Sequence, residues 1–71
     1  MPQGRISHIV RDRKTGKKLR GSVETVSTGT TYQILDLPQK YGMNDIVEFK
    51  ITDKNNKIAK VTRMVKKEYL L

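Results

Sequence analysis

Five short stretches of this chain have the residue pattern of β-strands, and no segment has the apolar spacing of a helix. In residues 46–52 the side chains of Val, Phe and Ile alternate with those of Glu, Lys and Thr, which makes one face of a strand apolar. Gly, Asn, Asp, Ser and Thr gather between the stretches, where turns are expected. The pattern predicts an all-β domain, with further strands at residues 4–11, 18–26, 30–35 and 58–65.

Three local irregularities are expected within this pattern. The step from Ile6 to Ile9 breaks strict alternation and predicts a bulge or a strong bend in the first strand. Gly21 interrupts the second strand, where a glycine often marks a bend or a close approach of two backbones. Pro38 cannot donate a ladder hydrogen bond, so the third strand should end before it. The longest connection then covers residues 38–45 and has room for one helical or 3₁₀ turn.

Length and composition limit the chain to one small domain. Its 71 residues include no cysteine and one histidine, so neither a disulfide nor an all-protein zinc site is expected. We treat residues 1–71 as a single domain with a loose tail from about residue 66. Residues 1–10 lack the apolar stretch of a secretory signal, and no run approaches the ~20 apolar residues of a membrane helix. The sequence therefore predicts a soluble, cytoplasmic protein without a membrane partner.

Positive charge is the most informative bulk property of the chain. Lys and Arg number 15 against 7 Asp and Glu, a formal net charge of +8. Asp12 is the one acidic residue among residues 1–20, which carry seven basic residues. A cationic surface of this density attracts polyanions, of which nucleic acid is the commonest. The alternative is a soluble domain that is basic but uses its positive charge to bind no partner.

Four segments of the chain resemble bacterial cold-shock domains. The last two strands of that family are matched by residues 41–51 (Y-G-M-N-D-I-V-E-F-K-I) and 58–61 (I-A-K-V). Its opening strand and its K-G-F-G-F motif are matched by residues 4–9 (G-R-I-S-H-I) and 18–23 (K-L-R-G-S-V). The resemblance implies a small five-stranded antiparallel barrel of the OB-fold type. An SH3-like barrel is the alternative because it too has five short strands, although the long connection after the third strand favours the OB fold.

The residues that bind nucleic acid in cold-shock domains are mostly replaced in this chain. That family stacks bases on exposed aromatic rings, and each stacked base contributes roughly 1 to 3 kcal/mol. His8 stands where the family has a tryptophan, and Arg20 and Ser22 stand where its first motif has phenylalanines. The second family motif, V-F-V-H-F, has its nearest counterpart in residues 31–35, where Tyr32 could serve. The resemblance therefore implies binding of single-stranded RNA or DNA in which phosphate contacts dominate and sequence preference is weak.

The basic hairpin of residues 11–20 is the best candidate for the binding surface. Its turn contains Gly16, which can adopt a positive φ. Lysines and arginines would neutralise phosphates, while His8 and Tyr32 would stack on bases. Each feature also has an alternative role that involves no ligand. The hairpin could be a solvated loop that protects an edge strand from pairing, His8 an ordinary surface residue, and Tyr32 a side chain that fills the rim of the barrel. The expected nucleic-acid contacts are Arg5, His8, Arg11, Arg13, Lys14, Lys17, Lys18, Arg20, Tyr32, Lys60 and Arg63.

Catalysis and cofactor binding find no support in the sequence. There is no cysteine nucleophile, and His8 has no marked Ser or Asp partner. The glycines match neither dinucleotide-binding nor phosphate-loop spacing. We therefore expect no enzyme activity, no cofactor and no metal. The second hypothesis is a protein-interaction module for an acidic protein or a ribonucleoprotein, which the missing aromatic residues favour.

Overall fold

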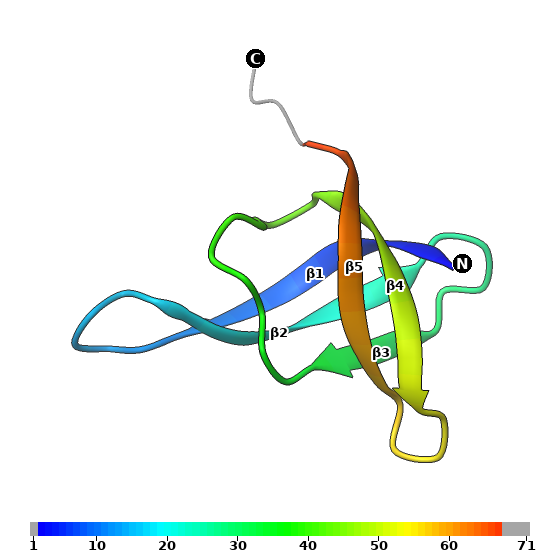
Figure 1. Ribbon diagram of the computed structural model, residues 1–71, viewed down its shortest axis with the longest axis horizontal. Helices are drawn as coiled ribbons and strands as arrows, with labels where there is room; N and C mark the ends of the chain where they lie inside the picture. Colours follow the sequence, from blue (N-terminus) through cyan, green and yellow to red (C-terminus); the bar gives the residue numbers. More distant parts are fainter. Residues whose placement is uncertain (1, 68–71) are drawn as a thin grey trace.

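The chain forms a closed barrel of five strands (Figure 1). The structure is a computed structural model, and it describes residues 2–67. Each strand expected from the sequence is present, with its ends moved by one residue or none. The strands are β1 (Gln3–Arg11), β2 (Lys18–Thr25), β3 (Thr31–Ile34), β4 (Ile46–Asp53) and β5 (Ile58–Lys66).

The strand order around the barrel is β1-β2-β3-β5-β4. Four of the neighbouring pairs are antiparallel, but β3 and β5 run parallel, with Gln33 opposite Ile58 and Ile34 opposite Ala59. The expectation of a purely antiparallel barrel is therefore wrong at this pair. The reason is geometric: strand direction must alternate between antiparallel neighbours, and a closed ring with an odd number of strands cannot alternate all the way round.

The two irregularities expected in β1 and β2 are confirmed. The pairing register of the two strands shifts between Ile6 and His8, which is the predicted bulge. Gly21 lies where the strands approach closely, because a Cβ at this position would stand 2.5 Å from the carbonyl oxygen of His8. The hairpin turn also contains the expected positive φ, at Gly16. These features bend the β1–β2 hairpin away from the barrel (Figure 1).

The core is small and includes side chains from the long connection between β3 and β4. Leu37 and Tyr41 are buried there, although Tyr41 is a loop aromatic by sequence. Residues 35–45 contain turns and bends but no helical or 3₁₀ turn, for which the connection has room. Phe49 is fully buried, as expected. The buried hydrophobic residues are Ile6, Val23, Ile34, Leu37, Tyr41, Val47, Phe49, Ala59 and Val61.

Residues 66 and 67, where the loose tail is expected to begin, have contacts with the barrel. Lys66 is the last residue of β5, and the ammonium of Lys67 lies 3.1 Å from the buried carboxylate of Asp45. The remainder of the expected tail, residues 68–71, lies outside the described residues. Within residues 2–67 no helix is long and apolar enough to cross a bilayer, and no group of acidic, histidine or cysteine side chains could hold a metal ion.

Candidate nucleic-acid interface

A polar groove runs over the outer face of β1, β2 and β3, and we call it the β1–β3 groove. The pairing register places His8 opposite Ser22, and Ser22 opposite Gln33. These side chains face outward because their neighbours along β2, Gly21 and Val23, are buried in the interior. The groove has a volume of about 250 Å³ and is lined by His8, Val10, Arg20, Gly21, Ser22, Gln33 and Ile34.

Beyond the groove the β1–β2 hairpin continues as a two-stranded arm, which we define as residues 9–20. The pairing of β1 with β4 ends at Arg5, and the pairing of β2 with β3 begins at Gly21. The hairpin therefore extends past the barrel with only its own two strands paired in the sheet (Figure 1). Arg20 belongs both to the base of the arm and to the lining of the groove, so the two surfaces are continuous.

The loop at the tip of the arm is ordered by Asp12. One oxygen of its carboxylate accepts hydrogen bonds from the backbone N–H groups of Lys14, at 2.7 Å, and Thr15, at 3.2 Å. The backbone N–H of Gly16 donates to the Asp12 carbonyl at 2.9 Å, and the Arg11 guanidinium donates to the Gly16 carbonyl at 3.0 Å. The one acidic side chain of the arm is thus used to shape the loop.

The remaining cations of the arm have no acidic partner among residues 2–67. Arg13, Lys14, Lys17 and Arg20 are exposed. Within the part of the chain that the structure describes, no carboxylate lies within ion-pair distance of any of them. Their positive field therefore reaches the solvent uncompensated and is available to an anionic ligand.

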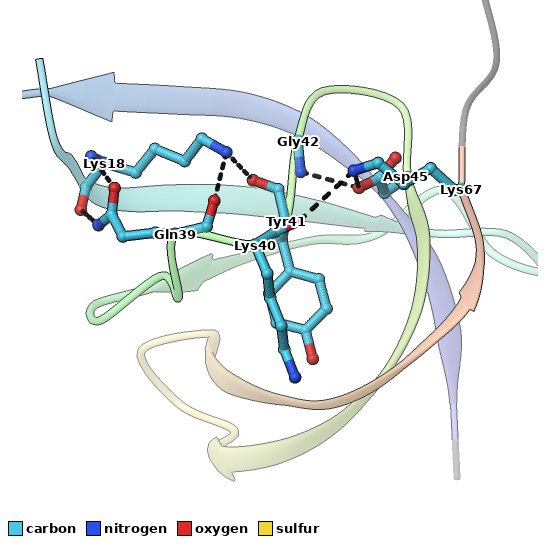
Figure 2. A network of polar contacts seen from close by, with 7 residues as sticks. All are labelled: Lys18, Gln39, Lys40, Tyr41, Gly42, Asp45 and Lys67. Carbon is cyan, nitrogen blue, oxygen red and sulfur yellow. Dashed lines mark hydrogen bonds and ion pairs between the residues drawn. The ribbon is translucent and has the colours of Figure 1, made fainter.

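Lys18 is used differently from its neighbours in the arm (Figure 2). Its ammonium donates to the backbone carbonyl of Gln39, at 2.6 Å, and to that of Tyr41. The side-chain amide of Gln39 in turn accepts from the Lys18 backbone N–H at 2.9 Å and donates to its carbonyl at 2.6 Å. Desolvation, and then the charges of Arg11 and Lys67, lower the pKa of Lys18. Lys18 therefore fastens the base of the arm to the β3–β4 connection.

Two of the expected contact residues, both arginines, lie in other surroundings. Arg5 donates to the side-chain oxygen of Asn44 at 3.0 Å and lies 3.6 Å from a carboxylate oxygen of Glu24. Arg63, on β5, binds the Glu48 carboxylate through two hydrogen bonds of 2.8 and 3.0 Å. The hydrogen bond from Arg63 lowers the pKa of Glu48. Both arginines thus have acidic partners, unlike the cations of the arm.

Lys60 and Tyr32 also stand apart from the β1–β3 groove. Lys60 is exposed on β5, opposite Lys50, and lines a second groove on the other side of β3. Tyr32 is half-buried, and its ring centroid lies 5.6 Å from that of Phe49 in the core. Its ring therefore packs against the interior of the barrel.

The groove contains polar side chains that sequence reasoning did not select. In the sequence Ser22 stands out only as a replacement for a family aromatic residue, and nothing marks Gln33, yet both line the groove. Alternation within residues 31–34 does place Gln33 outward, since Ile34 is buried. What alternation cannot give is the register that sets Gln33 beside Ser22 and hence near His8.

Comparison with known proteins finds no match among protein-family models, curated proteins or solved structures. Any proposal about function therefore rests on the geometry of the β1–β3 groove and the arm.

Proposed function

We propose that this protein binds single-stranded nucleic acid across the outer face of β1–β3, with the phosphates held mainly by the arm. The observation that carries the proposal is the continuity of two surfaces. Exposed cations that have no acidic partner in the described part of the chain occupy the arm, and Arg20 joins them to a groove of polar side chains. A strand whose phosphates contact the arm can therefore place its sugars and bases in the groove.

The strand order supports an OB-type barrel rather than an SH3-like one. Four strands lie in the spatial order β4-β1-β2-β3, which is the arrangement of a Greek key. The OB fold is a five-stranded Greek-key barrel that binds oligonucleotides on the face of its second and third strands and on the loops that join strands one to two and four to five. The β1–β3 groove covers that face, and the arm is the hairpin between the first two strands.

Phosphate contacts dominate the proposed binding mode, and base stacking is a minor contribution. Arg13, Lys14, Lys17 and Arg20 would neutralise phosphates and release their counterions. His8, Ser22 and Gln33 offer hydrogen bonds to sugars and base edges. The OB-fold pattern of stacking on aromatic rings is not reproduced in this groove, because none of its lining residues is Phe, Tyr or Trp.

Fluorescence anisotropy with labelled single-stranded RNA and DNA 12-mers tests the proposal. The affinity should fall log-linearly with salt, with a slope of about −0.7 for each phosphate contact. The double variant Arg13→Glu/Lys14→Glu should lower the affinity and reduce the slope by about 1.4, which is two contacts at about 0.7 each.

The matched control is Lys50→Glu/Lys66→Glu, which changes the net charge equally on the β4–β5 face. Both lysines are exposed, and Lys50 lies opposite Lys60, so its reversal removes a like-charge pair and does not disturb the fold. The control should lose much less affinity than the arm variant. Equal losses would show that the affinity depends on the net charge of the molecule and not on the arm. If no binding is detected even at low salt, the proposal is overturned in favour of a protein partner.

A further inference from the structure

A second groove, which we call the β3–β5 groove, lies on the other side of β3 from the first. Its volume is about 270 Å³, and Ile34 lines both grooves, so the two meet at the end of β3. The hydrogen bond from the Gln33 backbone N–H to the Lys57 carbonyl, at 2.7 Å, holds the β4–β5 turn against β3 at this place. The β3–β5 groove is bordered by Leu35, Asp36, Thr52, Ile58 and Lys60.

The lining of the β3–β5 groove is more apolar than that of the β1–β3 groove. Leu35 has 56% of its surface exposed, although it follows directly on the buried Ile34. Ile58, half-buried at the start of β5, lines the same groove. A flat ring placed over these two aliphatic side chains would remove apolar surface from water, which is favourable without any aromatic partner.

Asp36 gives the lining of this mostly apolar groove a single carboxylate. Its carboxylate is exposed, and no cation or hydrogen-bond donor contacts it within the described residues 2–67. A free carboxylate repels phosphate but accepts hydrogen bonds from the amino groups of bases, as Asp does from N4 of cytosine. Lys60 stands at the same groove with its ammonium exposed, where it can meet the phosphate of the same strand.

We propose that the β3–β5 groove holds one base of the bound strand and prefers a base with an exocyclic amino group to uracil. This inference rests on the proposed function, because the remainder of the strand is held by the arm and the β1–β3 groove. The volume favours a single base, since it lies below the ~300 Å³ at which typical small-molecule sites begin. The strand would therefore cross the end of β3, with Ile34 beneath the crossing point.

Oligocytidylate and oligouridylate RNA 12-mers, compared by fluorescence anisotropy at pH 7.5 and one salt concentration, test the inference. The two bases have the same ring, but cytosine carries an amino donor at the position where uracil carries a carbonyl acceptor. The protein should bind the cytidine strand about tenfold more tightly, the ratio expected of one hydrogen bond to a charged group. Equal affinities would overturn the inference and leave the proposed function intact, because both strands would still bind.

The variant Asp36→Asn identifies the group responsible for the preference. Its carboxamide can donate to uracil as well as accept from cytosine, so the ratio of the two affinities should fall towards one. The arm variant Arg13→Glu/Lys14→Glu is the matched control, since it should weaken both strands and leave their ratio unchanged. A cytidine preference that survives Asp36→Asn would contradict the inference, and failure of both strands to bind would remove the proposed function together with it.

Discussion

At the scale of single residues, neighbouring lysines in the arm have different tasks that depend on what their ammonium groups contact. Lys17 is exposed, and its side chain has no partner among the described residues. Lys18 follows it directly, yet its ammonium donates to two backbone carbonyls of the β3–β4 connection. The two residues are of the same type and adjacent in the sequence, so only their contacts distinguish a solvent-exposed cation from a structural one.

The pair Lys17→Met and Lys18→Met should separate binding from stability. Lys18→Met leaves two carbonyls without their donor and should lower the free energy of unfolding by about 1 to 3 kcal/mol, since each hydrogen bond contributes about 0.5 to 1.5 kcal/mol. Lys17→Met should leave the stability unchanged and reduce the salt slope of nucleic-acid binding by about 0.7. Urea unfolding and anisotropy titrations measure the two effects. The assignment fails if Lys17→Met is the less stable variant or if Lys18→Met is the one that changes the slope.

At the scale of secondary-structure elements, β4 and β5 are joined by an ion pair as well as by their ladder. Glu48 and Arg63 are cross-strand partners, and the carboxylate receives two hydrogen bonds from the guanidinium. The hydrogen bond from Arg63 lowers the pKa of Glu48 from its ordinary value of 4.5. The unfolded chain therefore binds a proton more readily than the folded one, which makes the contribution of this pair to stability dependent on pH.

Glu48→Gln should remove part of the decrease in folding stability that occurs at acidic pH. Because the folded pKa is the lower one, the contribution of the pair is fully present above about pH 4.5 and is lost as the pH falls through the folded value. The variant should therefore be less stable than the wild type at pH 7, and the difference should shrink as the pH is lowered towards 3. Urea unfolding midpoints at pH 7, 5, 4 and 3 measure this. A difference that stays constant with pH would show that packing, and not the charge of Glu48, is responsible.

The elements of the fold could be predicted from the sequence where side chains alternate. Alternation gave the strands, and its interruption at Ile6 and Ile9 gave the bulge, because both depend on neighbours along the chain. The parallel pairing of β3 with β5 could not be read in this way. It involves two residue pairs and follows from closure of the ring, a property of all five strands together.

Long-range contacts also set the limit of prediction at the candidate site. The excess of positive charge in the arm is visible in the sequence, and the structure leaves five of its cations exposed. The hydrogen bonds between Lys18 and Gln39 form because residues 35–45 cross the base of the arm. This segment has no strand-like or helix-like pattern of apolar residues from which its path could be predicted. The burial of Tyr41 was missed for the same reason, since a loop aromatic gives no indication of the face that it will meet.

At the scale of the whole molecule, the net charge of +8 is held within a radius of gyration of 11.6 Å. Charges at such separations repel one another across the entire fold at low ionic strength, where the Debye length is about 30 Å at 0.01 M. Three ion pairs are present among residues 2–67, and they leave most of the lysines and arginines without an acidic partner. Folding therefore concentrates like charges that the unfolded chain keeps further apart.

Salt should consequently stabilise the folded protein while it weakens the binding of nucleic acid. Raising NaCl from about 0.01 M to about 0.15 M shortens the Debye length to about 8 Å, which screens most of the repulsion across the molecule. The thermal midpoint of the free protein should rise over this range, and the rise should be smaller for Lys50→Glu/Lys66→Glu, whose net charge is lower. Thermal unfolding followed by circular dichroism measures both. If the midpoint falls as salt is added, the attraction within the three ion pairs, which salt also screens, must outweigh the repulsion among the remaining cations. The positive surface would then not lower the stability of the fold.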